Sequence, residues 1–296
     1  GRNGGFCSYS LTHGFMNGCS RFKDEMAIIE RLGRENLEAI EATIKKYGID
    51  CQFELTGEIS VANEEWQMED LIEIANLRNS FGDSVQILSK EEMQARVHSP
   101  ISVGGLWDPD GTALIDPARL VWGLEQACIK SGVVIYENTS ALWLERASKG
   151  IIVHTPYGTV YAQKVALATN IYRSLIRRAK KYVVPVYDFQ LVTEPLTPEQ
   201  MESIGWKNRE GLSEAGNQFH YYRLSADNRI LWGGYDAMYY FGGKVNARYD
   251  ERAVVQRRCD GRLLSTFTLA RAGESRITVT YRGAVMQGTV AVCFER

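Results

Sequence analysis

The sequence predicts a mixed α/β protein in which helices and a parallel sheet form one unit and an antiparallel sheet forms another. Residues 104–136 read as strand, turn, strand, helix and buried strand, the succession typical of α/β units. Residues 141–162 and 219–235 instead consist of short extended segments separated by turn residues, which is typical of meanders and hairpins. The chain has 296 residues, a length that favours about two domains.

The composition is that of an ordinary globular protein and argues against several other classes. The net charge of -2 gives no electrostatic basis for binding nucleic acid or an anionic membrane, and no apolar run is long enough to span a bilayer. The six cysteines are scattered without a C-x-x-C pair, so we expect reduced thiols and a cytoplasmic location. The four histidines are equally dispersed, and their spacing predicts no metal site.

The first part of the chain alternates predicted helices with short strands. Apolar residues three or four apart predict a long helix over residues 23–47, which Gly48 ends. Ser89 begins a shorter helix as its N-cap, and Glu92 completes a capping box. The other expected elements here are two extended segments and a helix, over residues 51–62, 85–88 and 66–81 respectively.

The most regular stretch begins at residue 104. Two short strands within residues 104–115 flank a turn, after which Asp116 is an N-cap and Pro117 takes the first helical position. Gly132 ends this helix, and the apolar residues 133–136 predict a buried strand of a parallel sheet.

Another strand is expected over residues 164–170, after the predicted meander. Ligands in open α/β sheets bind beyond the carboxyl ends of strands, so the last residues of this strand are candidates for a binding site. They are Ala168, Thr169 and Asn170. A plain exit from strand to loop explains the same residues equally well.

The later part of the chain predicts an antiparallel sheet rich in aromatic residues, placed to cover a pocket. Its strands are expected over residues 183–193, 219–224 and 229–235. Four polar or aromatic side chains on them are candidates for the substrate pocket: Tyr187, Gln190, Tyr221 and Arg223. Arg223 is a candidate partner for a substrate carboxylate. The alternative is that these are ordinary sheet aromatics and a surface arginine.

The chain opens on a glycine-rich loop that also contains an arginine and an asparagine. The loop consists of Gly1, Arg2, Asn3, Gly4 and Gly5. Glycines let a backbone approach a ligand closely, and successive N–H groups in such a loop can form an anion-binding nest. A flexible terminus is the alternative interpretation.

Several segments together resemble the FAD-dependent oxidoreductases of the D-amino-acid oxidase superfamily, in particular the branch that includes gamma-glutamylputrescine oxidase. They are GRNGGFC, GTALIDPARLVWGLEQACIKSGVVIYENT, VALATN, VPVYDFQLVTEP and YYRLSADNRILWGGYD. The resemblance implies an FAD-binding domain of the glutathione-reductase type, interleaved with an antiparallel-sheet substrate domain. The FAD-binding domain would comprise residues 1–50 and 104–180, the substrate domain residues 51–103 and 181–251, and residues 252–296 would form a divergent tail.

The resemblance also implies FAD as the cofactor and a small amine or amino acid as the substrate, oxidised at its C–N bond by hydride transfer to the flavin. Gly1 to Gly5 would lie against the flavin and its ribityl-phosphate chain. Thr139, Ser140 and Ala141 would contact the adenine through their backbone, and residues 168–170 would run under the cofactor. We assign no catalytic side chain, because the flavin performs the difficult step.

One part of the family pattern is missing from the sequence. The chain contains no G-x-G-x-x-G turn, whose N–H groups hold the pyrophosphate at a helix N-terminus. We therefore expect an incomplete FAD-binding domain that lacks the N-terminal dinucleotide-binding motif. Two other interpretations stay open: a non-catalytic fragment unable to hold FAD and, less favoured, a nicotinamide-dependent dehydrogenase.

Overall fold

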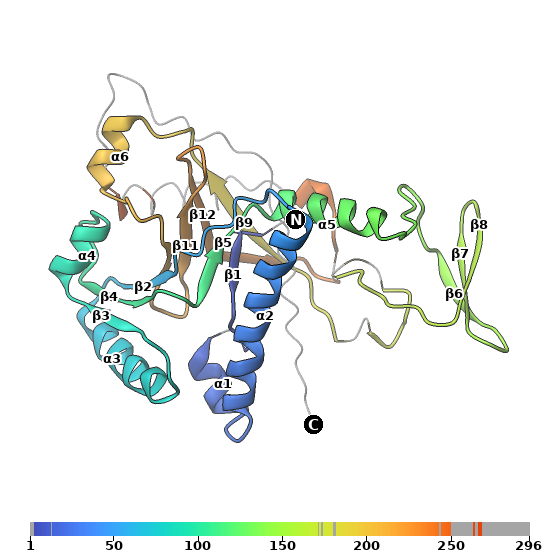
Figure 1. Ribbon diagram of the computed structural model, residues 1–296, viewed down its shortest axis with the longest axis horizontal. Helices are drawn as coiled ribbons and strands as arrows, with labels where there is room; N and C mark the ends of the chain where they lie inside the picture. Colours follow the sequence, from blue (N-terminus) through green and yellow to red (C-terminus); the bar gives the residue numbers. More distant parts are fainter. Residues whose placement is uncertain are drawn as a thin grey trace.

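A computed structural model describes residues 3–12, 14–170, 172, 174–179, 182–242, 244–249, 263, 266 and 267. Within these residues, seven strands form one sheet, called here the large sheet, in the order β3-β4-β2-β10-β11-β12-β9 (Figure 1). The strands are β2 (Glu58–Ala62), β3 (Gln86–Leu88), β4 (Gly104–Asp108), β9 (Val186–Val192), β10 (Gly211–Glu214), β11 (His220–Leu224) and β12 (Ile230–Tyr239). The predicted antiparallel sheet is thus present, but β2 and β10 pair in parallel.

One face of the large sheet forms the main hydrophobic core. Alternate strand residues such as Ile59, Leu212, Tyr222 and Trp232 are buried there. The short helices α4 (Lys90–Arg96) and α6 (Pro198–Ile204) supply Met93 and Ile204 to the same cluster. Because successive side chains of a strand point to opposite faces, the intervening residues face the other way.

The chain's opening segment belongs to a smaller sheet beside the large one. β1 (Phe6–Ser8) pairs antiparallel with β5 (Thr112–Leu114). The long helix α2 (Met26–Tyr47) packs on this pair through Leu37 and Ile44. α1 (Phe15–Arg21) precedes α2, and α5 (Pro117–Lys130) follows β5 (Figure 1).

The helix signals of the sequence are confirmed. α2 ends where Gly48 adopts a left-handed φ of 62°, and α3 (Glu65–Ser80) covers the predicted residues 66–81 within one residue at each end. Ser89 and Glu92 form the predicted capping box at the start of α4. These helix ends are local hydrogen-bonded motifs, so the sequence alone specifies them.

Two predicted strands are wrong. Residues 133–136 and 164–170 contain no strand, and Val134 and Tyr136 are 70% and 71% exposed. An apolar run becomes a strand only where a neighbouring strand accepts its backbone hydrogen bonds, and no described residue pairs with these two segments.

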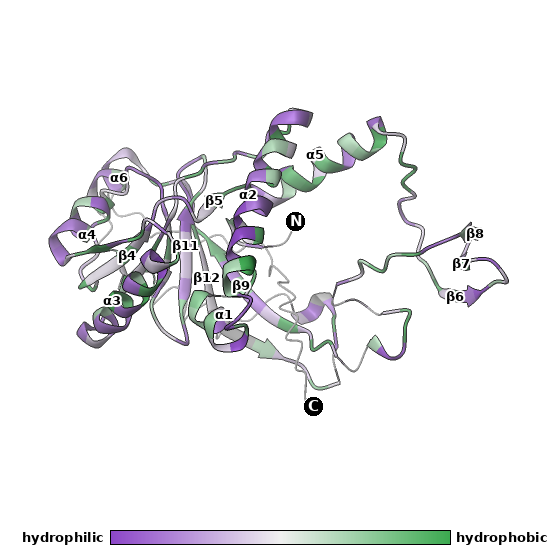
Figure 2. Cartoon of the chain, turned by 60° about the horizontal axis from the view of Figure 1, so that its bottom comes forward, coloured by the Kyte–Doolittle hydropathy of each residue, from purple (hydrophilic) through white to green (hydrophobic). Residues whose placement is uncertain are grey.

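The predicted meander is confirmed as β6 (Trp143–Arg146), β7 (Ile151–Thr155) and β8 (Gly158–Ala162). Figures 1 and 2 both show it at the far end of α5, away from the large sheet. Figure 2 also shows hydrophobic residues along α5, and Trp122 on this helix is 63% exposed.

Some expectations concern residues or features that the structure describes only in part. The expected tail, residues 252–296, lies outside the described residues apart from Leu263, Thr266 and Phe267. In the described part of the chain, no helix is both long and apolar enough to cross a membrane. The described cysteines Cys7, Cys19, Cys51 and Cys128 carry free thiols.

Removing the N-cap of α5 tests whether this local hydrogen-bonded motif stabilises the helix. The Asp116 side chain accepts hydrogen bonds from the backbone N–H groups of Ala118 and Arg119 at 2.9 and 3.1 Å. Asp116→Ala is therefore expected to lower the free energy of unfolding by about 1 kcal/mol in urea titrations. Asp50→Ala is the control, since Asp50 also contacts Arg119 but its side chain is 81% exposed. Equal losses in the two variants would contradict the capping role.

Candidate functional site

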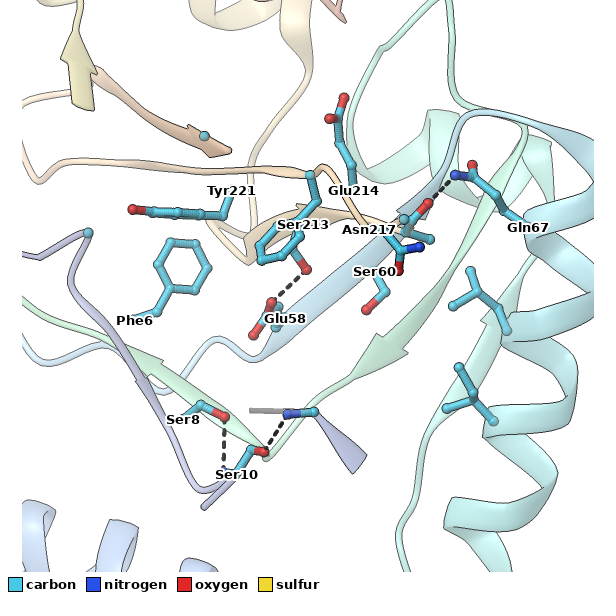
Figure 3. A pocket seen from close by; sticks show the side chains of 18 of the residues that line it. Phe6, Ser8, Ser10, Glu58, Ser60, Gln67, Ser213, Glu214, Asn217 and Tyr221 are labelled. Atoms are coloured by element: carbon cyan, nitrogen blue, oxygen red, sulfur yellow. Dashed lines mark hydrogen bonds between the residues drawn. The ribbon is translucent and has the colours of Figure 1, made fainter. Parts of the chain in front are cut away.

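An open cavity of about 970 Å³ lies between β1, α3 and the polar face of the large sheet. Figure 3 shows Phe6 and Ser8 of β1 across the cavity from Glu58 and Ser213. Other lining residues that matter below are Asn3, Gly4, Ser60, Trp66, Asp70, Asp188, Glu214 and Tyr221.

The strand period explains why polar side chains line the cavity. On β2, Glu58 and Ser60 face the cavity, whereas Ile59 and Val61 are buried in the core on the opposite face. β10 follows the same rule, with Ser213 in the cavity and Leu212 in the core. One sheet therefore separates an apolar core from a polar cavity.

The opening loop is fixed by hydrogen bonds at each residue from Asn3 to Gly5. The Asn3 Oδ1 atom accepts the N–H of Gly5 at 2.9 Å, and the carbonyl of Gly5 accepts the N–H of Ile115 at 2.9 Å. Gly5 has a φ of 79°, and a Cβ there would collide with the Ile115 carbonyl. The Gly5 N–H is thus directed to Asn3, so it does not serve as a donor of the predicted anion-binding nest.

Arg223 holds this loop from behind and is not part of the cavity lining. Its Nε donates to the Gly4 carbonyl at 2.6 Å, its Nη2 to the Ile115 carbonyl at 2.8 Å, and its Nη1 to the Leu224 carbonyl at 3.2 Å. Burial lowers the pKa of this guanidinium, against the opposing effect of nearby carboxylates. The structure therefore gives Arg223 backbone carbonyls as partners, in place of the predicted substrate carboxylate.

Gln190 and Tyr221 lie together beside Gly4, and of the two only Tyr221 is among the described residues that line the cavity. The Gln190 Nε2 donates to the Tyr221 hydroxyl at 3.1 Å, and that hydroxyl donates to the Asp188 Oδ2 at 2.9 Å. The Tyr221 ring meets the Phe6 ring edge to face at 5.6 Å. Tyr187 does not join them, because it is buried in the core on the opposite face of β9.

The remaining predicted cofactor residues are not brought to this cavity. Gly1 and Arg2 lie outside the described residues. Thr139, Ser140 and Ala141 lie in the connection before β6, and Ala168, Thr169 and Asn170 lie in the connection after β8; none of them lines the cavity. Asn170 has a left-handed φ of 50°, as in a turn.

Glu58 is the site residue that the sequence analysis missed. Its Oε1 accepts the Ser213 hydroxyl at 2.7 Å, and its Oε2 accepts the Thr112 hydroxyl at 3.0 Å. Burial raises the pKa of the Glu58 carboxyl above its ordinary value of 4.5, while the two hydroxyls act in the opposite direction. The signal was present in the sequence: Glu58 and Ser60 alternate with apolar residues along one strand.

A smaller cavity of about 370 Å³ adjoins the first and shares Glu58 with it. Its cationic lining residue, Arg78, is bound to Asp83 and Asp108 at 2.6 Å each and donates to the Tyr9 hydroxyl at 2.6 Å. Burial raises the pKa of Tyr9. The charge of Arg78 is therefore already balanced inside the protein.

Comparisons with known proteins identify relatives of this chain. The family model DAO, described as "FAD dependent oxidoreductase", matches residues 1–283. The chain is 31% identical over 247 residues to "Probable oxidoreductase OrdL" of Haemophilus influenzae, covering 79% of this chain and 55% of that protein. It is 29% identical over 203 residues to "Gamma-glutamylputrescine oxidoreductase" of Escherichia coli, covering 68% and 47% respectively. The chain thus spans about half the length of these relatives.

Solved structures share the fold at low sequence identity. Glycine oxidase from Geobacillus kaustophilus superposes with a TM-score of 0.67 at 19% identity, over 89% of this chain and 66% of that one. L-proline dehydrogenase from P. horikoshii superposes with a TM-score of 0.65 at 16% identity, over 81% and 65%. This likeness confirms the predicted fold class.

Replacing Arg223 tests its role as the clamp of the opening loop. Arg223→Lys keeps the charge, but a single ammonium group cannot reach three carbonyls that a planar fork spans. We expect the free energy of unfolding to fall by about 1.5–3 kcal/mol, the value of a hydrogen bond to a charged group. Arg229→Lys, at an arginine paired with the half-exposed Glu194, is the control. An Arg223→Lys protein as stable as this control would contradict the clamp.

The pH dependence of stability tests the environment of Glu58. The folded state raises the pKa of this carboxyl, so its ionisation destabilises the fold as the pH rises from 4.5 toward the folded pKa. Glu58→Gln removes that ionisation. The stability of the variant relative to the wild type is expected to be constant below pH 4.5 and to increase above it. The control is Glu69→Gln, an exposed glutamate of α3. A flat difference across this pH range would contradict the assignment.

Proposed function

This chain belongs to the DAO family of FAD-dependent oxidoreductases, and from this premise we propose that it oxidises the C–N bond of a small amine or amino acid with FAD as its cofactor. The observation that carries the proposal is the cavity between the glycine loop and the aromatic strands. A loop that brings backbone close to a cavity, facing aromatic and amide side chains, suits a planar cofactor and a small substrate.

The lining residues fit the ring end of FAD better than its diphosphate. At Gly4 a Cβ would lie 2.5 Å from the Tyr221 Cε2 and 2.9 Å from the Gln190 Nε2, so only glycine allows this approach of the loop. Of the lining residues, Asn3 and Tyr221 offer amide and hydroxyl groups near Gly4, which suit the carbonyl and imide groups of an isoalloxazine ring. Within the described lining of this cavity there is no arginine or lysine to neutralise a diphosphate.

In this proposal the protein binds and orients while the cofactor provides the redox chemistry. FAD, when bound, supplies a two-electron acceptor for the hydride that leaves the carbon beside the nitrogen. The rings of Phe6 and Tyr221, which meet edge to face, would form an apolar surface beside the reacting carbon. The Gln190–Tyr221–Asp188 hydrogen-bond chain holds that surface in one orientation. Because the nitrogen lone pair must assist, an ammonium substrate first gives a proton to water. Loss of the hydride then leaves an iminium ion, which water hydrolyses to a carbonyl compound and a protonated amine or ammonium.

The domain division stays part of the proposal. The FAD-binding domain would comprise residues 1–50 and 104–180, and the substrate domain residues 51–103 and 181–251. Strand pairing supports one refinement: β4 pairs with β2 and β3, whereas β5 pairs with β1. The FAD-binding domain would therefore resume after Asp108. We also propose a cytoplasmic location, which the free thiols of the described cysteines support.

Cofactor retention tests the proposal. The full chain is incubated with FAD, desalted and examined by visible absorption; small amines and amino acids are then added without oxygen. We expect a retained flavin spectrum that bleaches when a substrate is added. Gly4→Ala should lose the flavin because its methyl group would meet Tyr221 and Gln190.

The matched control is Gly48→Asn, at an exposed left-handed position with nothing within 4 Å of the added Cβ. It should retain as much flavin as the wild type. A colourless wild-type protein would contradict the proposal and favour a non-catalytic chain; a colourless protein that reduces NAD⁺ or NADP⁺ when an amine or amino acid is added would favour a dehydrogenase.

A further inference from the structure

We propose that Glu58 determines the substrate class by binding the ammonium group of a cationic amine, so that the cavity takes amines in preference to free amino acids. This inference rests on the proposed function, since it concerns the same cavity. It goes further by assigning a specificity-determining residue and by choosing between two substrate classes.

The contacts of Glu58 leave its negative charge without a cationic partner among the described ion pairs. Its hydrogen bonds come from the neutral hydroxyls of Ser213 and Thr112, at 2.7 and 3.0 Å. No described salt bridge includes Glu58. A carboxylate offers about four acceptor positions, so two hydroxyls leave room for further donors.

Of the charged neighbours of Glu58, Arg78 favours the ionised carboxylate through its charge but makes its ion pairs with other carboxylates. Asp108 has the same sign as Glu58, and Arg78 is bound to Asp83 and Asp108 at 2.6 Å each. A buried carboxylate in this situation is stabilised when a cation enters beside it. Glu58 lines both cavities, so a ligand can reach it.

The rest of the cavity favours the same class of ligand. Three further carboxylates line it, from Asp70, Asp188 and Glu214, and its described lining contains no arginine or lysine. Phe6, Trp66 and Tyr221 add aromatic rings, whose faces attract cations. A low-dielectric cleft lined by one sign of charge concentrates ligands of the opposite sign.

The described lining of the cavity contains no arginine or lysine that could bind a carboxylate ligand. The sequence suggested Arg223 as the partner of a substrate carboxylate. In the structure its N–H groups donate to the carbonyls of Gly4, Ile115 and Leu224. A substrate carboxylate would instead meet the side chain of Glu58 or Asp188. Repulsion between these like charges disfavours binding.

A purely structural role for Glu58 makes a different prediction. If it only bound the hydroxyls of Ser213 and Thr112, glutamine would be a good substitute, because its oxygen accepts from one hydroxyl and its amide nitrogen can donate to the oxygen of the other. Binding of an ammonium group needs the charge as well. Glu58→Gln and Glu58→Asp separate the two roles, since the first removes the charge and the second keeps it.

The experiment is isothermal titration of the full chain, without added FAD, with butylamine and with gamma-aminobutyrate. The two probes share an ammonium group and a short alkyl chain, but the second also carries a carboxylate. We expect the wild type to bind butylamine at least about tenfold more tightly, a difference equal to one decade in Kd. Glu58→Gln should lose about that factor for butylamine, and Glu58→Asp should keep the preference.

Glu69→Gln controls for general loss of negative charge, and thermal unfolding of each variant controls for its fold. Equal affinities of the wild type for both probes, absence of butylamine binding, or unchanged butylamine binding by a folded Glu58→Gln protein would each overturn the inference. Flavin reduction is measured separately. Amine binding that depends on Glu58, without flavin reduction by any amine, would overturn the proposed oxidation and leave the assignment of Glu58 intact.

Discussion

The position of the cavity wall depends on the hydrogen bonds that the buried guanidinium of Arg223 donates. The guanidinium links a strand of the large sheet to the carbonyls of Gly4 and Ile115, which lie far apart in the sequence. Buried carbonyls are costly unless they are hydrogen-bonded, and a charged donor satisfies them more strongly than a neutral one. Arg223 therefore holds the loop against Tyr221. The loop's glycines allow its backbone to come this close to the tyrosine ring.

A second arginine performs the matching task at the other end of β1. Arg78 of α3 binds Asp83 and Asp108 and donates to the hydroxyl of Tyr9, the residue after β1. Arg223 acts just before β1 and Arg78 just after it, so this short strand is held at both ends by buried charge. Three residues paired with β5 would form a weak sheet by themselves, and these two contacts give the cavity a rigid wall.

The large sheet combines stability and function through its two faces. Strands β2 and β10 bury Ile59 and Leu212 on the core face, while the same strands present Glu58 and Ser213 to the cavity. A buried carboxylate held by two hydroxyls costs stability when it is ionised. Such a residue lowers the stability of the free protein but favours binding of a cationic ligand. This exchange of stability for binding is expected at a functional site.

Neighbouring residues specify where helices begin and end, as at Ser89 and Gly48, so the sequence predicted these positions. The alternating pattern of the later strands also predicted a sheet. Side chains alternate between the two faces of β9, so Tyr187 and Gln190 lie on opposite faces, although the sequence analysis grouped them. Three features followed from the folded chain: residues 133–136 form no strand, Arg223 binds backbone carbonyls, and Glu58 faces the cavity without a described salt bridge. Each of these depends on partners distant in the chain, which local patterns cannot specify.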